Sequence, residues 1–269
     1  MTYQFVPAET PPSDILRLCK GSPFRSIQGE GFYAGVPSTF VRLAGCNLRC
    51  CEEGGRFFNC DTVDGQRDYS IVQEEFRPLS SAAYEISVDD LSGKLVGAEL
   101  AAPHLVITGG EPLLQETQLH LLFGSIFDRE LTPEITLETN GTLLPKDSML
   151  LDWIRLVSLS PKLQAPRRDI LEGWFQLRAV MLGEVEIQLK VVCSCLQDYQ
   201  EALDLFNWAS GMSKAVCFVQ LASDDTSPQR PEHRKGNRAI IEALRRDAPL
   251  AGGYPVRLSS QLHKSWEIP

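Results

Sequence analysis

The chain has 269 residues, of which 43% are hydrophobic and 23% are charged, a composition typical of globular proteins that excludes disordered and fibrous classes. Its formal net charge of -9 disfavours a nucleic-acid partner, because both molecules would be acidic. Its longest apolar runs, such as 119–123 and 154–159, are far shorter than the roughly 18 residues of a membrane span, so we expect a soluble protein with no membrane partner.

The N-terminal residues 1–10 lack the charged start and the apolar stretch of a secretory signal, which favours a cytoplasmic location. Further along, residues 38–43 alternate in polarity and predict a half-buried strand. The segment 68–100 is mostly polar and is interpreted as a surface elaboration. Within it, a capping box at 87–90 predicts a helix over 91–99.

Strands and helices alternate through the rest of the chain. Apolar runs predict strands at 104–108, 134–138, 156–159, 186–192, 215–221 and 255–259, and helical spacing predicts helices over 113–127, 169–182, 196–210 and 231–246. Such alternation is typical of an α/β fold with a parallel sheet, in which polar loops gather at the carboxyl ends of the strands. We expect one domain over residues 1–269.

Cysteine is the most informative residue type, since 8 are present and thiols stay reduced in the cytoplasm. Cys46, Cys50, Cys51 and Cys60 lie in one loop directly after the strand at 38–43. Three thiolates from one flexible loop can hold a cubane iron-sulfur cluster, and four can hold zinc, although adjacent cysteines share one ion only with strain. Unligated buried thiols are the third interpretation, and the spacing alone leaves all three open.

Short motifs follow the predicted strands. In chain order they are Ser26-Ile-Gln-Gly-Glu-Gly31, Phe40-Val-Arg-Leu-Ala-Gly-Cys46-Asn-Leu-Arg-Cys50, Cys60-Asp-Thr62, Thr108-Gly-Gly-Glu-Pro112, Glu138-Thr-Asn-Gly-Thr142, Ser160-Pro-Lys162, Leu189-Lys-Val-Val192 and Gln261-Leu-His-Lys264. Together they resemble the radical S-adenosylmethionine enzymes, and within them the 7-carboxy-7-deazaguanine synthases. The resemblance covers most of the chain and implies an incomplete parallel (β/α) barrel of the radical S-adenosylmethionine type, in a single domain with an expanded cluster loop.

The chain departs from this family in its cysteine loop. Residues 51–59 separate Cys50 from Cys60, where the family has two residues. A turn at Gly54-Gly55 would bring Cys60 back to the cluster. The region 63–103 is also longer than the family minimum. We therefore expect insertions at 51–59 and 63–103, the second of which either covers the site, builds a partner interface or is a tolerated surface insertion.

The resemblance implies a 4Fe-4S cluster on Cys46, Cys50 and Cys60, with Cys51 as the alternative to Cys50. The iron left vacant binds S-adenosylmethionine, the source of a 5'-deoxyadenosyl radical. Without the cysteine loop, residues 109–111 would be interpreted as an ordinary strand-to-helix turn. The residues implied to bind the cofactor are Asn59, Cys60, Asp61, Gly109, Gly110, Glu111, Glu138, Asn140, Ser160, Pro161 and Lys162.

The implied substrate is 6-carboxy-5,6,7,8-tetrahydropterin, with Thr62 as a ligand of Mg2+. Gln28 and Glu30 supply the donors and acceptors that its guanidine-like edge requires, and Arg42 can pair with its carboxylate, unless it is a solvated strand charge. For His263 a structural role is the alternative. The full set of expected substrate contacts is Ile27, Gln28, Gly29, Glu30, Arg42, Thr108, His263 and Pro269.

The expected activity is that of a carbon-nitrogen lyase that contracts the pterin ring to 7-carboxy-7-deazaguanine with loss of ammonia, in queuosine and 7-deazapurine biosynthesis. The resemblance implies a homodimer and a reductase such as flavodoxin or ferredoxin. A radical activase that makes a glycyl radical on a partner protein leaves Gln28, Glu30 and Thr62 unexplained. A non-catalytic zinc-binding interaction protein is the alternative of another class.

Overall fold

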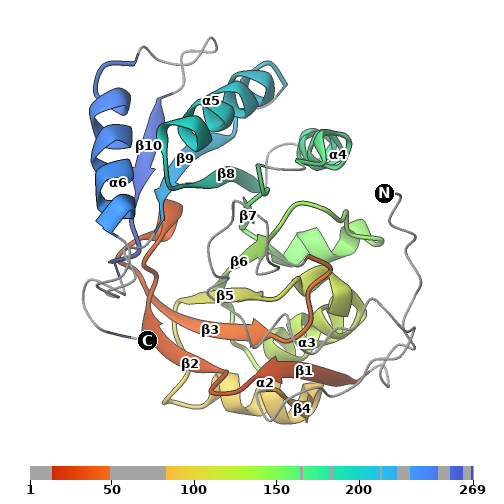
Figure 1. The fold of residues 1–269 in the computed structure, drawn as a ribbon. Coiled ribbons are helices and arrows are strands. Elements are labelled where there is room, and N and C mark those ends of the chain that lie inside the picture. The colour runs from red at the N-terminus through yellow and green to blue at the C-terminus, as the bar shows by residue number, and fades with distance from the viewer. Residues whose placement is uncertain are drawn as a thin grey trace, which may run out of the picture. The chain divides into compact units, whose positions relative to one another are not determined.

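A computed structural model of the chain describes residues 14–48, 83–163, 166–181, 185–212, 214–222, 231–247, 255–262 and 268 (Figure 1). These residues form two compact units. The first holds the described residues up to Arg25 and Ser38–Ile135, and the second holds Ser26–Pro37 and the described residues from Thr136 onward. One domain over residues 1–269 stays a prediction.

The first unit contains both parallel and antiparallel strands. They are β1 (Ile15–Cys19), β3 (Pro37–Leu43), β4 (Ala83–Ser87) and β5 (His104–Gly109), in the order β5-β3-β1-β4. The strand β2 (Phe24–Ile27) begins in this unit and ends in the second. β3 and β5 are parallel, whereas β1 is antiparallel to β3 and to β4. The carboxyl ends of β3 and β5 therefore lie side by side, with Leu43 opposite Gly109.

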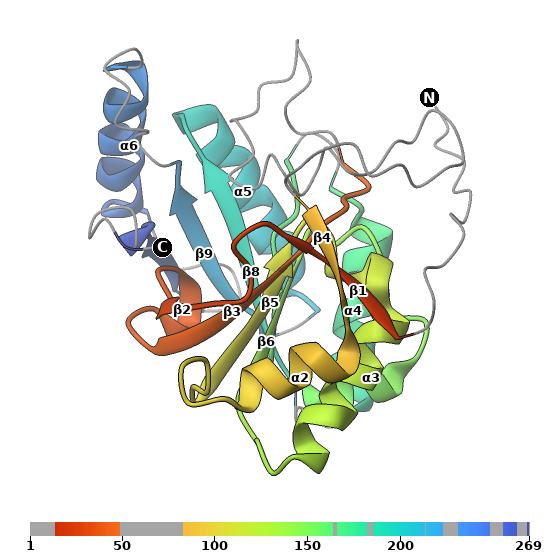
Figure 2. The ribbon, with the colours of Figure 1, turned by 90° about the horizontal axis from the view of Figure 1, so that it is seen from below.

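The described part of this unit also contains three helical segments: α2 (Val88–Val96), the 3-10 helix η2 (Pro112–Gln115) and α3 (Glu116–Asp128). The Ser87 hydroxyl accepts from the Asp90 amide at 3.1 Å, which confirms the predicted capping box. α2 ends at Val96 rather than at residue 99, because Gly97 has an extended backbone. Leu91 and Leu95 are buried, and α2 lies beside α3 (Figure 2).

The prediction of a surface elaboration over 68–100 is wrong for its described part. β4 pairs along its whole length with β1, and α2 buries its apolar side against the unit. The polar character of the segment concealed this role, because only alternate residues of an edge strand and one side of a helix need to be apolar.

The second unit is an all-parallel arrangement in the order β10-β9-β8-β7-β6. Its strands are β6 (Glu134–Thr139), β7 (Leu156–Leu159), β8 (Glu186–Cys193), β9 (Val216–Leu221) and β10 (Val256–Ser259). β7 is buried throughout, and Leu189 and Val191 of β8 are fully buried. Strands covered on both faces are apolar almost continuously, which is why the sequence predicts them well.

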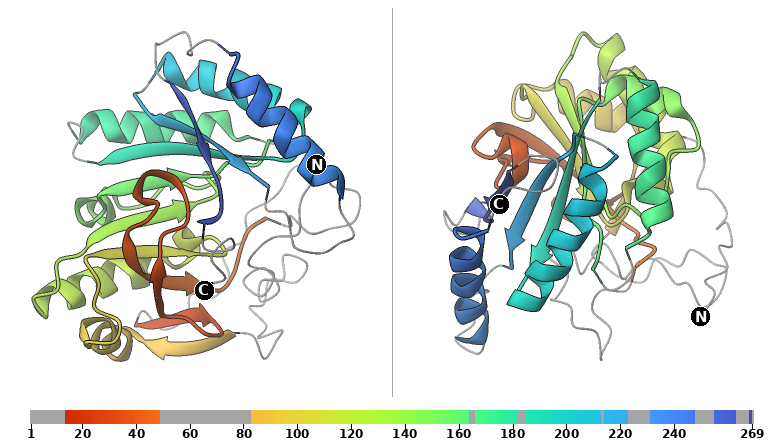
Figure 3. Two further views of the ribbon diagram at one scale, coloured as in Figure 1. Left: turned by 90° about the vertical axis from the view of Figure 1, so that its left-hand side faces the viewer. Right: turned by 90° about the horizontal axis from the view of Figure 1, so that it is seen from above.

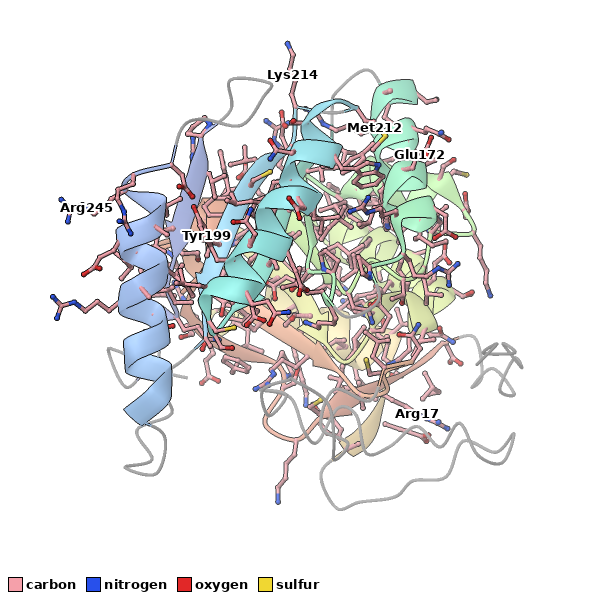
Figure 4. All side chains as sticks on the ribbon, turned by 45° about the horizontal axis from the view of Figure 1, so that its top comes forward. Arg17, Glu172, Tyr199, Met212, Lys214 and Arg245 are labelled. Atoms are coloured by element: carbon pink, nitrogen blue, oxygen red, sulfur yellow. The ribbon has the colours of Figure 1, made fainter. Side chains whose placement is uncertain are left out.

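Helices connect these strands. They are η3 (Ser148–Trp153), α4 (Arg168–Val180), α5 (Leu196–Ser210) and α6 (Pro231–Leu244). The short 3-10 helix η1 (Gly31–Tyr33) lies earlier in the chain, between β2 and β3. α5 packs on β8 and β9 and lies beside α6 (Figure 3). The buried hydroxyl of Tyr199, labelled on α5 in Figure 4, hydrogen-bonds to Asp247 beyond α6 and ties the two helices together.

The predicted alternation of strands and helices is confirmed, with ends that differ by a few residues. The expected helix over 113–127 is divided into η2 and α3, whose boundary lies between Gln115 and Glu116. No described helix combines the length and the hydropathy that crossing a membrane requires.

Candidate functional site

The predicted site residues that the structure describes form two groups, one in each unit. The first group is Arg42, Cys46, Thr108, Gly109, Gly110 and Glu111. The second group is Ile27, Gln28, Gly29, Glu30, Glu138, Asn140, Ser160, Pro161 and Lys162. Outside the described residues lie Cys50, Cys51, Asn59, Cys60, Asp61, Thr62, His263 and Pro269.

In the first group, two backbones approach closely. The Gly110 amide donates to the Leu43 carbonyl at 2.8 Å, and the Glu111 amide donates to the Gly45 carbonyl at 2.7 Å. A Cβ atom on Gly110 would lie 1.9 Å from the Gly45 oxygen. One on Gly109, where φ is +116°, would lie 2.2 Å from the Leu43 oxygen. Both glycines are therefore required by the packing of this turn against the segment that leads to Cys46.

Cys46 is 5% exposed, and its sulfur accepts from the Leu48 amide at 3.4 Å. The segment before it is anchored by Gln115, whose amide nitrogen donates to the carbonyls of Ala44 and Arg17, both at 3.0 Å. The Gln115 oxygen accepts from the Arg17 amide at 2.8 Å (Arg17 is labelled in Figure 4). Gln115 thus ties the segment before Cys46 to β1, a role that the sequence analysis missed.

The Glu111 carboxylate is fully buried and accepts from the Leu113 amide at 3.2 Å, as the N-cap of η2. The alternative interpretation of this motif is a strand-to-helix turn with an acidic residue at the start of the helix, and the contact with Leu113 agrees with it. Binding of S-adenosylmethionine by Glu111 stays a prediction.

Arg42 and Thr108 lie opposite each other in the register of β3 and β5. Val41 and Leu43 are fully buried while Arg42 is half-buried, so the predicted alternation along β3 is confirmed. The backbone amide of Arg42 donates to the Ser22 hydroxyl at 2.8 Å. Arg42 and Thr108 therefore share a position next to the glycine turn, and their contact with substrate stays a prediction.

In the second group, the loop that carries residues 27–30 is fixed at both ends. The backbone N-H of Gln28 donates to the backbone carbonyl of Val36, and the backbone N-H of Gly35 donates to the backbone carbonyl of Gln28, both at 2.8 Å. The Phe32 amide donates to the Gln188 side chain on β8 at 2.9 Å, and the Gly31 amide donates to the Ser259 hydroxyl at 3.1 Å. β8 and the end of β10 therefore set the position of this loop.

A cluster of charged and amide side chains, consisting of Gln28, Glu30, Glu138, Lys190 and Gln261, lies beside the loop. The Lys190 ammonium forms an ion pair with one oxygen of Glu30 and lies 3.9 Å from Glu138 Oε1. The side-chain amide of Gln261 donates to the other oxygen of Glu30 at 2.7 Å. The side-chain amide of Gln28 donates to the Glu138 carboxylate at 3.2 Å. The carboxylate of Glu30 is thus held at both of its oxygens.

Polar residues also follow β6 and β7. The Ser160 amide donates to the Thr139 carbonyl at 2.8 Å, which places Asn140 and Ser160 at neighbouring strand ends. The Asn140 side chain is buried and accepts from the Thr142 amide at 2.9 Å. The predicted gathering of polar residues at the carboxyl ends of these strands is confirmed.

Sequence reasoning assigned no role to Lys190, Gln188 or Gln261, although Lys190 and Gln261 occur in motifs that carry the resemblance. A lysine inside an apolar strand is a signal in itself, because a lysine is almost never fully buried without a partner. Its partner was not visible, since Glu30 is remote from Lys190 in the sequence.

Comparisons with known proteins complete the description. No family model matches the chain. It is 41% identical to the 7-carboxy-7-deazaguanine synthase of Hyperthermus butylicus, over 91% of each chain, and 30% identical to that of Rhodospirillum rubrum, over 97% of each. The crystal structure of QueE from Escherichia coli matches 92% of this chain and 94% of its own with a TM-score of 0.53 at 22% identity, which confirms the predicted fold of the radical S-adenosylmethionine type.

Proposed function

Because the chain belongs to the 7-carboxy-7-deazaguanine synthases, we propose that it contracts the ring of 6-carboxy-5,6,7,8-tetrahydropterin to 7-carboxy-7-deazaguanine with loss of ammonia, in queuosine and 7-deazapurine biosynthesis. The observation that carries this proposal is the fixed carboxylate of Glu30, whose two oxygens are held by Lys190 and Gln261. Neighbouring N-H groups on the pyrimidine edge of a pterin are suitable donors to such a carboxylate.

The residues of the first unit suit an iron-sulfur cluster and its ligand. The sulfur of Cys46 accepts from the Leu48 amide, and hydrogen bonds of this kind support the thiolate ligands of iron-sulfur clusters. In the proposal, Cys46, Cys50 and Cys60 hold a 4Fe-4S cluster, and residues 109–111 with Asn140 and residues 160–162 bind S-adenosylmethionine. When bound, the cluster and S-adenosylmethionine supply the radical chemistry of the reaction.

The remaining proposed roles concern the substrate. Gln28 and Glu30 bind its pyrimidine edge, Arg42 pairs with its carboxylate, and Thr62 contributes to a Mg2+ site that orients the same carboxylate. A homodimer, a flavodoxin or ferredoxin as electron donor and a cytoplasmic location complete the proposal.

The test is anaerobic reconstitution of the protein with iron and sulfide, followed by incubation with S-adenosylmethionine, dithionite, Mg2+ and 6-carboxytetrahydropterin. We expect 7-carboxy-7-deazaguanine, identified by mass and absorbance, and no product without S-adenosylmethionine. Glu30→Gln should retain iron and lose most of the turnover. Reductive cleavage of S-adenosylmethionine without conversion of the pterin would favour the activase instead, and a preparation that binds zinc but no iron would contradict both enzymes.

A further inference from the structure

Lys190 is a charged residue in the middle of a buried strand. Its neighbours in β8, Leu189 and Val191, are fully buried, and its own side chain is 7% exposed. Removing an ammonium group from water is unfavourable unless opposite charges and hydrogen bonds compensate for the lost hydration. Lys190 has such compensation from two carboxylates, Glu30 and Glu138.

We infer that Lys190 is a positioning residue for substrate recognition: its ammonium group fixes the Glu30 carboxylate in the orientation that selects a ring with adjacent N-H donors, as in a 2-amino-4-oxopyrimidine. This inference rests on the proposed function, because the ring is that of the pterin substrate. Lys190 itself acts through Glu30 and need not contact the substrate.

The geometry of the Glu30 carboxylate supports this assignment. Lys190 pairs with one oxygen from β8, and Gln261 donates to the other from the segment after β10, so the carboxylate is held from two directions. The backbone of Glu30 is held as well, because its N-H donates to the side-chain oxygen of Gln28 at 3.2 Å.

The balance of charge explains why the residue at position 190 must be a cation. Glu30 and Glu138 have side chains 15% and 22% exposed, and both lie within ion-pair distance of the same ammonium group. Without Lys190, two carboxylates would remain in a poorly hydrated region and repel each other. Glu30 would then turn toward water, away from the orientation that recognises the ring.

A purely structural role for Lys190 predicts a different result. In that case Lys190→Met would lower stability without changing the ratio of substrate affinity to S-adenosylmethionine affinity. The two roles are separated by a double-mutant cycle with Glu30→Gln, because a residue that acts only through Glu30 has little further effect once the Glu30 charge is gone.

The experiment uses the reconstituted full chain with S-adenosylmethionine and Mg2+ but no reductant, so that the pterin binds without turnover. Affinity for 6-carboxytetrahydropterin is measured by anaerobic equilibrium dialysis for the wild type, Lys190→Met, Lys190→Arg, Glu30→Gln and Glu30→Gln/Lys190→Met. We expect Lys190→Met to weaken binding by about tenfold or more, the loss typical of a charge-assisted hydrogen bond. Lys190→Arg should restore part of the affinity, and the double variant should match Glu30→Gln.

Iron content, measured on the same samples, should stay at the wild-type value. The matched control is Arg178→Met, which breaks another ion pair at β8, between Arg178 Nη2 and Glu186 Oε2 at 3.0 Å. This pair is partly exposed, and Glu186 begins β8, four residues before Lys190, so substrate affinity should not change.

Wild-type substrate affinity in Lys190→Met would overturn the inference, as would a double variant that binds about tenfold more weakly than Glu30→Gln. If Lys190→Met fails to fold, the double variant still decides, because it removes both charges together. A wild-type protein that binds no pterin at all, while holding iron and S-adenosylmethionine, would contradict the proposed function itself and is therefore a distinguishable failure.

Discussion

The two groups of site residues are held in place by different forces. In the first unit, the glycine turn at 109–110 is fixed by backbone hydrogen bonds and by direct backbone packing, and a neutral amide, Gln115, anchors the neighbouring segment. In the second unit, Glu30 is fixed by the charge of Lys190 and by the side chain of Gln261. The first group should therefore be sensitive to added atoms, and the second to lost charges.

The largest effect should come from an added methyl group at Gly110. Its Cβ would lie 1.9 Å from the Gly45 oxygen, so the two backbones must separate, at a cost of about 3 kcal/mol or more. Gly110→Ala should show this loss in urea unfolding and should bind little iron after reconstitution, since the segment before Cys46 moves.

Gly124→Ala is the matched control for this change. Gly124 lies in α3, and a Cβ atom there would have no neighbour within 4 Å. Because alanine is the better helix former, this variant should be more stable by about 0.5–1 kcal/mol and should keep its iron. Equal destabilisation by Gly110→Ala and Gly124→Ala would contradict the conclusion that backbone packing holds the first group of site residues in place.

Acid should lower the stability of the protein through the buried, neutral side chain of His104 in the first unit. Burial lowers the pKa of His104 to about 4, against 6.5 for an ordinary histidine, and its Nδ1 lies 2.7 Å from the Ser38 hydroxyl. The unfolded chain therefore takes up the proton first, so this contribution to stability is complete above about pH 6.5 and decreases as the pH falls toward 4. The total loss is about 3 kcal/mol.

Unfolding free energies measured by urea titration between pH 7 and pH 4 test this dependence. His104→Leu should be less stable than the wild type at pH 7, because the hydrogen bond between Ser38 and His104 is lost, but its stability should change less with pH. The same steep decrease in the variant would assign the acid sensitivity to other groups.

Gln115→Leu should weaken the anchor of the cysteine segment. The substitution leaves the amide of Arg17 and the carbonyls of Arg17 and Ala44 without this partner in a buried region, a loss of about 2–3 kcal/mol. Reconstituted protein should also lose iron to a chelator faster than the wild type. Gln176→Leu, at an exposed position of α4, should stay within about 0.5 kcal/mol, and a similar loss there would refute the anchoring role.

The sequence predicts the parallel strands better than the antiparallel ones. β7 is a buried, mostly apolar run, and β8 is buried along most of its length and carries an apolar residue at every second position from Ile187 to Val191, so both are visible in the sequence. β4 is a short edge strand in a polar segment, and it becomes a strand because β1 offers it a partner. Edge strands depend on tertiary pairing, so their sequences carry little of the signal.

The same distinction applies to the candidate site. Gly109 and Gly110 were identifiable as functional candidates, but the reason for them is the backbone of Leu43 and Gly45, which is remote in the sequence. Gln28 and Glu30 were identifiable from one motif, whereas their contacts with Glu138 and Lys190 depend on how the loop lies against β6 and β8. Motifs thus select candidate residues, and long-range contacts determine the surroundings of those residues.

The smallest expected effect is that of an added methyl group at Gly31, in the second unit. At Gly31, φ is +68° and a Cβ atom would lie 2.5 Å from the Gln188 amide nitrogen. Gly35 has φ of +93° and no neighbour within 4 Å, so Gly35→Ala shares the backbone strain of about 1 kcal/mol but not the collision. Since the Gln188 side chain can move aside, Gly31→Ala should be only slightly less stable than Gly35→Ala.

The difference should instead appear in substrate affinity. Moving Gln188 removes the acceptor of the Phe32 amide, 2.9 Å away, and loosens the loop that carries Glu30. We expect Gly31→Ala to bind the pterin about threefold to tenfold more weakly than Gly35→Ala, the effect of one lost hydrogen bond, in the same dialysis measurement. Equal affinities would show that the charges of Lys190 and Glu30 hold the loop without this anchor, and that the second group depends on charge alone.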